Sequence, residues 1–304
     1  MDVMKDESTI TLTEGDLRAE FWPDAGMLGT SLRYRDEELL RRIDDLETSK
    51  RKGSTAGIPL LYPWANRLAA PHYRAAGRDV ELDPASPLLH FDDHGLSMHG
   101  VPWGQLVWDV LDKGQASLRA RLRWNRPELL AVFPFPHDLE IVARVTSNAL
   151  TVQTTVLANG GSSVPISFGF HPYLGIPDLP RDQWQLQLPR MRKLQLDVRG
   201  IPTGAEEAFA PVNAPLGEAS YDNGFALIDE QPSFSLAGGQ LRITVTFLEG
   251  FPYTQVFAPK GKNFIALEPM TAPANSLLSG QGLRALQAGG QFPASFRIAM
   301  NSNR

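Results

Sequence analysis

The sequence has 304 residues, of which 42% are hydrophobic and 21% charged, with a formal net charge of -5 and a pI near 5.7. This composition is typical of a globular protein with one large or two average domains, and the acidic balance argues against a nucleic-acid-binding protein. Cysteine is absent, which excludes disulfides and thiolate catalysis and fits a reducing, cytoplasmic compartment. Residues 1–7 lack the apolar core of a secretory signal, and no stretch approaches the roughly 20 apolar residues of a membrane span.

Apolar and polar residues alternate with a period of two along most of the chain. In chain order, this pattern predicts strands over 9–13, 17–22, 117–124, 139–146, 150–156, 241–247 and 295–300. The stretch 117–124 alternates throughout with arginines on one face, and 139–146 and 150–156 are typical of a hairpin that turns at 147–148. Such alternation favours antiparallel sheets with one face on a core and one in solvent.

Helical patterns are scarce, and only residues 37–45 predict a short helix. Glycine (26 residues) and proline (24 residues) are spread throughout, and turn signals at intervals of roughly ten residues favour a sandwich or barrel over βαβ units. The sequence has no internal repeat, low-complexity tract or obvious linker. We therefore expect residues 1–304 to form one large β-sandwich domain.

Two segments interrupt the strand pattern and are typical of functional loops. The first, 58–68, has prolines on both sides of an apolar run and continues into Asn66 and Arg67. The second, 89–100, holds three of the six histidines of the chain.

The histidines of the second loop, together with its acidic residues, could form a metal site, because imidazole and carboxylate groups bind divalent ions. The residues in question are His90, Asp92, Asp93, His94 and His99. Their spacing matches no helical zinc motif, so a solvated loop with one useful histidine is favoured and no metal is expected.

Two further motifs, 167–173 and 267–270, each place one ionisable side chain directly before a proline at the end of an apolar stretch. Because proline donates no ladder hydrogen bond, we expect His171 and Glu268 to lie at strand ends beside loops. A histidine and a carboxylate in one cleft suffice for paired proton transfer. Taken singly, each of them could instead be structural, and Arg67 could be an ordinary ion-pair partner.

Known cofactor motifs are absent from the sequence: no nucleophile elbow, phosphate-binding loop or dinucleotide fingerprint is present. The sequence therefore favours a cofactor-free acid–base enzyme or a binding module.

Five short motifs carry a family resemblance: 62–67, 98–100, 169–173, 221–222 and 267–271. In this order they resemble the aldose 1-epimerases, the galactose-mutarotase-like family, from about Pro59 to Asn275. The resemblance implies an all-β fold, a large antiparallel β-sandwich with few short helices, in agreement with the period-two pattern. It also implies a free aldohexose as substrate, interconverted between its α and β anomers, and no cofactor.

Carried over by position, the resemblance implies that Glu268 is the general base and His171 the general acid of ring opening. It further implies that the sugar hydroxyls are bound by Asn66, Arg67, His99, Asp222 and Gln255. With reference pKa values of about 4.3 and 6.5, we expect a carboxylate at Glu268 and an imidazolium at His171 near neutral pH.

Three alternatives remain open at this point. A hexose-phosphate 1-epimerase would need more cations than Arg67 and His99 supply. A non-catalytic sugar-binding or regulatory domain would be free to lose Glu268 or His171. A polysaccharide groove lined by tryptophan and phenylalanine is disfavoured, because these residues are expected mainly in the core. The expected partner is a small sugar, with neither nucleic acid nor membrane, and the expected assembly is a monomer or homodimer.

Overall fold

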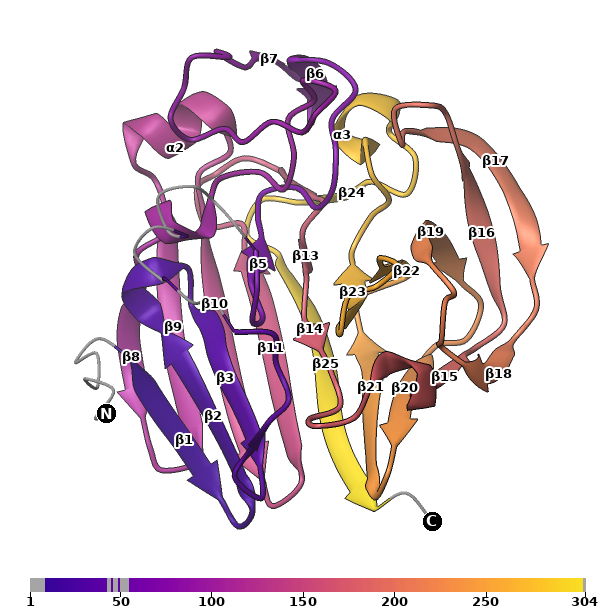
Figure 1. Ribbon diagram of the computed structural model, residues 1–304. Helices are drawn as coiled ribbons and strands as arrows, with labels where there is room; N and C mark the ends of the chain where they lie inside the picture. Colours follow the sequence, from indigo (N-terminus) through magenta and orange to yellow (C-terminus); the bar gives the residue numbers. More distant parts are fainter. Residues whose placement is uncertain (1–8, 43–44, 46–48, 50–54, 303–304) are drawn as a thin grey trace.

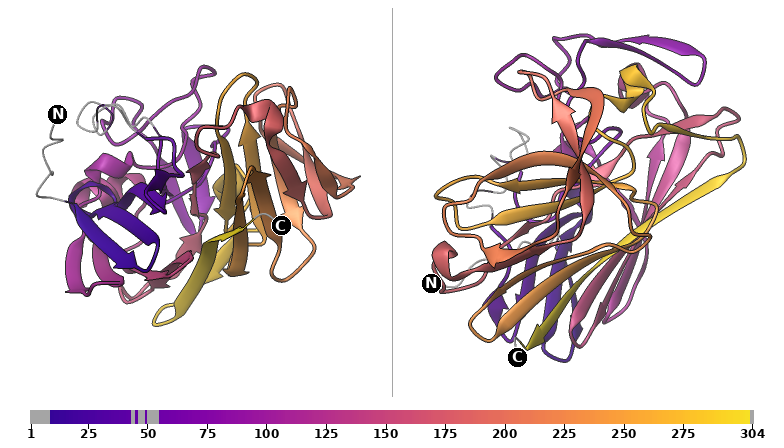
Figure 2. Two further views of the ribbon diagram at one scale, coloured as in Figure 1. Left: turned by 60° about the horizontal axis from the view of Figure 1, so that its bottom comes forward. Right: turned by 90° about the vertical axis from the view of Figure 1, so that its right-hand side faces the viewer.

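The structure is a computed structural model that describes residues 9–42, 45, 49 and 55–302. Antiparallel sheet dominates this part of the chain (Figures 1 and 2). The described helices are short: α2 (Pro127–Val132), α3 (Ser276–Ser279) and the 3-10 turns η1 (Pro23–Ala25), η2 (Trp103–Gln105) and η3 (Arg181–Gln183). None of the helices in these ranges is long and apolar enough to cross a membrane.

One layer is a nine-stranded sheet. Its strands, in spatial order, are β18 (Val212–Pro215), β15 (Gln185–Leu188), β20 (Ser233–Gly238), β21 (Leu241–Glu249), β25 (Gln291–Ser302), β11 (Ala149–Leu157), β10 (His137–Thr146), β9 (Ser117–Trp124) and β8 (Asp109–Lys113). The predicted hairpin is confirmed, because Thr146 pairs with Ala149 across a two-residue turn. The arginine face of β9 is confirmed as well, and Glu140 of β10 forms ion pairs with Arg119 and Arg121 there.

The other layer consists of an eight-stranded and a four-stranded sheet, which lie over the nine-stranded sheet (Figure 1). The eight-stranded sheet contains β17 (Pro202–Phe209), β16 (Met191–Leu196), β19 (Tyr221–Leu227), β22 (Tyr253–Ala258), β23 (Ile265–Met270), β13 (Gly169–Phe170), β5 (Leu60–Leu61) and β14 (Tyr173–Leu174), which pairs with β23. The four-stranded sheet contains β1 (Ile10–Glu14), β2 (Leu17–Trp22), β3 (Leu28–Tyr34) and β4 (Glu37–Glu38). Two further strand pairs are β12 (Val164–Ile166) with β24 (Arg284–Leu286), and β6 (His72–Ala75) with β7 (Arg78–Glu81).

The main hydrophobic core lies between these layers. Phe170 of β13 packs on Phe296 of β25 with ring centroids 5.1 Å apart, and β1 and β2 contact β10. Alternate residues of the strands point into this core and are fully buried, as the period-two pattern predicts. The predicted strands and the all-β fold of layered antiparallel sheets are thus confirmed.

The helix expected over 37–45 is wrong in its first half. Residues 37–38 form β4. The N–H of Leu39 donates to the carbonyl oxygen of Leu32, and the carbonyl oxygen of Leu39 accepts the N–H of Gly175. The carboxylate of Glu38 accepts hydrogen bonds from the backbone N–H groups of Leu32 and Leu40. The hairpin with β3 and the long-range hydrogen bond to Gly175 override the local helical pattern, whereas residues 43–44 lie outside the described residues.

Candidate active site

A row of three polar side chains crosses the eight-stranded sheet. Gln255 of β22 pairs with Glu268 of β23. On the other side of β23, both β13 and β14 pair with it. The two strands keep the same register, although the chain leaves the ladder between them at His171 and Pro172. This register places His171 opposite Glu268, so that Gln255, Glu268 and His171 are cross-strand neighbours on one face of the sheet.

That face points away from the core, because the sheet alternates residue by residue. Val256, Leu267 and Phe170 are the chain neighbours of the three polar residues, and all three are buried in the main core. Successive side chains of a strand point to opposite faces. The catalytic candidates therefore lie on the outer face of a sheet whose inner face forms the core.

The strand-end prediction holds for His171, which directly follows β13, but is wrong for Glu268, which lies within β23. Pro269 is tolerated inside this central strand because the neighbouring ladder is interrupted. The N–H of Thr271 donates to Phe168 O across this side, and by alternation the ring nitrogen of Pro269 faces the same side, opposite Phe170, where the ladder between β13 and β23 stops.

Glu268 and His171 are in direct contact. Nε2 of His171 lies 3.2 Å from Oε1 of Glu268, and the two side chains are only 6% and 2% exposed, respectively. Oε2 of Glu268 is buried and has no hydrogen-bond partner among the described residues. Since an unpaired buried carboxyl oxygen is costly, this atom is a ready acceptor or donor for a bound hydroxyl.

Burial shifts both groups toward their neutral forms. It raises the pKa of Glu268 well above its usual value, and the nearby charge of Asp222 adds to this effect while Arg67 opposes it. Burial likewise lowers the pKa of His171 well below its usual value, reinforced by His99. The carboxylate–imidazolium form expected from reference values is therefore disfavoured. In either distribution, however, the contacting pair shares one proton and has no net charge.

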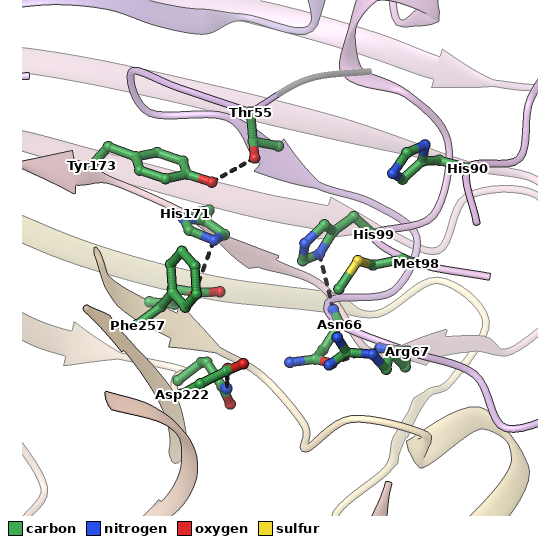
Figure 3. A pocket seen from close by; sticks show the side chains of 12 residues that line it. Thr55, Asn66, Arg67, His90, Met98, His99, His171, Tyr173, Asp222 and Phe257 are labelled. Atoms are coloured by element: carbon green, nitrogen blue, oxygen red, sulfur yellow. Dashed lines mark hydrogen bonds and ion pairs between the residues drawn. The ribbon is translucent and has the colours of Figure 1, made fainter. Parts of the chain in front are cut away.

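The imidazole of His171 is held by aromatic packing. The ring of Tyr173 stacks on it at a centroid distance of 4.1 Å and an interplanar angle of 12°, and Phe257 contacts it edge-on at 5.9 Å. The hydroxyl of Tyr173 is hydrogen-bonded to the hydroxyl of Thr55 at 2.5 Å (Figure 3). These contacts restrict the plane of the imidazole and thereby the direction of its Nε2.

The loop residues Asn66 and His99 meet the pair from the other side of the pocket. The backbone N–H of Asn66 donates to Nδ1 of His99 at 3.2 Å, which leaves Nε2 of His99 as the protonated nitrogen (Figure 3). Burial, with the charges of His90 and Arg67, lowers the pKa of His99 to about 3, so its ring is neutral. Both residues have positive φ, 59° for Asn66 and 63° for His99, a strained conformation that is common at functional sites.

Arg67 is the guanidinium of the pocket, and it is fixed by the histidine-containing loop. Its Nε donates to Oδ2 of Asp92 at 2.6 Å, while Oδ1 of Asp92 accepts the backbone N–H groups of His94 and Leu96. Burial opposes the ionisation of Asp92, but these hydrogen bonds outweigh it and lower its pKa. Asp92 is therefore an ion-pair partner rather than a metal ligand.

The remaining predicted residues complete the pocket. Nε2 of Gln255 donates to Oδ1 of Asp222 at 2.7 Å, so the two side chains act as one polar unit. The pocket has a volume of about 340 Å³, within the usual range for small-molecule sites. All seven residues predicted from the sequence line it (Glu268, His171, Asn66, Arg67, His99, Asp222 and Gln255), together with five that were not assigned: Thr55, His90, Met98, Tyr173 and Phe257.

Some of these missed residues could have been found from the alternation alone. Tyr173 follows His171 by two residues and Phe257 follows Gln255 by two, which places each pair on one face of the sheet. His90 shows that the loop 89–100 contributes two histidines to the pocket rather than the one expected. Asp93 and His94 are exposed. In the described ranges, no three His, Asp or Glu side chains are grouped so as to hold a metal ion.

Known proteins share this fold and sequence pattern. A family model described as aldose 1-epimerase matches residues 8–299. A galactose mutarotase-like protein from Clostridium acetobutylicum has a TM-score of 0.83 at 17% identity, covering 97% of this chain and 95% of its own. For galactose 1-epimerase from Lactobacillus acidophilus NCFM the TM-score is 0.78 at 15% identity, with coverage of 100% and 98%.

In sequence, the chain is 23% identical over 248 residues to the uncharacterized protein YihR of Escherichia coli K12, covering 79% of this chain and 77% of that protein. The structural likeness at such low identity establishes the fold, and the family model covers nearly the whole sequence. The chain therefore belongs to the aldose 1-epimerase family.

Proposed function

We propose that this protein is an aldose 1-epimerase that interconverts the α and β anomers of a free aldohexose. The observation that carries the proposal is the buried contact of 3.2 Å between Glu268 and His171 at a pocket of sugar size. A carboxyl and an imidazole that share one proton can remove a proton from one oxygen while they deliver one to another.

Ring opening follows from this pair. The carboxylate of Glu268 takes the proton of the C1 hydroxyl, Nε2–H of His171 donates its proton to the ring oxygen, and the C1–O5 bond breaks to give an aldehyde. After rotation about C1–C2, the C5 hydroxyl attacks the other face of C1. His171 then recovers its proton from that hydroxyl while Glu268 returns its proton to O1, so the enzyme ends as it began.

The pair reaches its reactive form without help from solvent. Burial favours the neutral distribution, with the proton on Glu268, and the direct contact allows this proton to pass to His171. Each such proton transfer contributes on the order of 10²–10⁴-fold to the rate.

The other polar residues would hold the sugar. Arg67 and the protonated nitrogen of His99 are donors, whereas Asp222 offers carboxylate oxygens. Their convergence from two loops and one sheet would fix O1 and O5 against the acid–base pair, which is where positioning contributes most to the rate.

A free sugar is favoured over a sugar phosphate. The charge of Arg67 is already paired with Asp92 at 2.6 Å, and the two central histidines have lowered pKa values. A phosphate would require further cations. The name of the Lactobacillus acidophilus relative, galactose 1-epimerase, is in keeping with a free aldose. We further propose that residues 1–304 act as one catalytic domain, since one core cluster includes residues of all three large sheets.

The test is polarimetry of freshly dissolved α-D-glucose and α-D-galactose with the purified protein. We expect faster relaxation of the optical rotation with the wild-type protein and with D79N, which alters only an exposed ion pair. We expect none with E268Q or H171N. Sugar binding without any acceleration by the wild-type protein would instead support a non-catalytic binding domain.

A further inference from the structure

We propose that Asp92 is a specificity-determining residue, which offsets the charge of Arg67 and thereby restricts the pocket to sugars without a negative charge. The inference rests on the proposed function in taking this pocket as the sugar site. It concerns which sugars are admitted rather than the proton transfers.

The first support is the geometry of the ion pair. Asp92 lies behind Arg67 and does not line the pocket, whereas Arg67 does. Nε of Arg67 is 2.6 Å from Oδ2 of Asp92, and the Asp92 side chain is only 8% exposed. A buried pair at this distance is poorly screened by solvent, so its two charges largely cancel toward a ligand in the pocket.

The second support is that, among the described lining residues, the pocket wall has no second arginine or lysine that could attract an anionic sugar. Among the lining residues in the described part of the chain, Arg67 is the one arginine and there is no lysine. Arg41 lies outside the lining, with its guanidinium over the rings of Tyr173 and Phe264. With the Glu268–His171 pair and the Arg67–Asp92 pair each neutral overall, Asp222 is the one acidic side chain among the described lining residues that is not balanced by an arginine, a lysine or a shared proton.

The third support is that neighbouring groups confine the guanidinium of Arg67. A Cβ at Gly200 would lie 3.1 Å from Nη1 of Arg67, so the turn at Gly200 covers the guanidinium at close range. Nη1 also lies 3.4 Å from Oδ1 of Asn66. Arg67 is thereby confined between Asp92, Asn66 and this turn, so that the substrate meets a fixed donor whose charge is already compensated.

The experiment compares D-glucose with D-glucuronate, which differ by a hydroxymethyl group and a carboxylate at C6. Dissociation constants are measured by ligand-observed NMR titration at pH 8, above the reference pKa of about 6.5 for an imidazole. The proteins are the wild type, D92N, D92E and D79N. The D92N substitution removes the charge but keeps an amide oxygen that accepts the N–H groups of His94 and Leu96.

We expect the wild-type protein to prefer glucose, and D92N to shift the ratio of the two dissociation constants toward glucuronate by about fivefold to tenfold at low salt. D92E should keep the wild-type ratio. D79N should keep it too, because it changes the net charge equally at the exposed Arg74–Asp79 pair. The R67Q substitution leaves the charge of Asp92 uncompensated and should shift the ratio of the two dissociation constants further toward glucose. It provides the test if D92N does not fold.

An unchanged ratio in D92N, or an equal loss of affinity for both sugars, would overturn the inference and leave Asp92 as a purely orienting residue. Binding is measured separately from catalysis, so the two proposals fail in different ways. Selective binding by a protein that does not accelerate mutarotation would overturn the proposed function alone.

Discussion

The two sides of the pocket are built in different ways. On one side, His171, Glu268 and Gln255 project from paired strands, and their alignment is set by strand register. On the other side, Asn66 and His99 lie on loops and adopt positive φ angles. The comparison teaches that strand pairing aligns the proposed acid–base pair, whereas specific contacts hold the loop residues Asn66, Arg67 and His99. Asp222 and Gln255, also proposed to bind hydroxyls, lie on strands of the same sheet.

The largest effect is expected from substitutions of Glu268 and His171 on the sheet side of the pocket. E268Q keeps the shape of the side chain but cannot exchange a proton, so we expect kcat to fall by about 10²–10⁴-fold with little change in KM. H171N should fall by a similar factor, and the double variant should be little worse than either single one because the two groups act as a unit. Polarimetric initial rates measure this. Additive losses in the double variant would contradict the paired mechanism.

Breaking the loop side should give a different kinetic signature. R67Q removes a charged donor, so we expect kcat/KM to fall by about tenfold to a hundredfold, mainly through a higher KM. The matched control is R74Q, which removes an exposed guanidinium from its pair with Asp79 and should leave both constants unchanged. A loss confined to kcat would place Arg67 in the proton-transfer step instead.

A smaller effect sharpens the role of the aromatic support. Y173F keeps the ring that stacks on His171 but loses the hydrogen bond to Thr55. We expect kcat to fall by only about twofold to tenfold, the range of one neutral hydrogen bond. Y173L, which removes the stacking ring as well, should fall further. Equal activity of the two variants would show that the stack does not hold the imidazole.

The smallest expected effect is that of pH. We expect kcat to fall when the Glu268–His171 pair gains a second proton, which requires a pH well below 6.5 because burial lowers the pKa of His171. It should also fall when the pair loses its shared proton, and burial moves that limit upward because it raises the pKa of Glu268. We therefore expect kcat at pH 5.5 and pH 7 to agree within about twofold. An inflection of the kcat profile near pH 6.5 would contradict this assignment.

The sequence predicted seven of the strands (β1, β2, β9, β10, β11, β21 and β25) and seven of the residues that line the pocket, because period-two alternation and short motifs are local signals. It did not predict that Glu268 lies within a strand, since this depends on the interruption of a neighbouring strand nearly a hundred residues away. The same limit explains why the sequence, which favoured a solvated loop over 89–100, did not predict the ion pair between Asp92 and Arg67. The strand β4 was missed for a different reason, because it pairs with β3 in a short hairpin whose turn at Arg35 and Asp36 the helical pattern of 37–45 obscured.

The alternation of β22, β23 and β13 links the strand register to the direction in which each side chain points. A register shift of one position in β23 would turn the side chain of Glu268 into the hydrophobic core and that of Leu267 to the outer face of the sheet, which strongly disfavours the misaligned pairing. The register that buries Leu267 in the core is therefore the same register that places Glu268 opposite His171. A molecule in which these strands pair in register has therefore also brought Glu268 and His171 face to face.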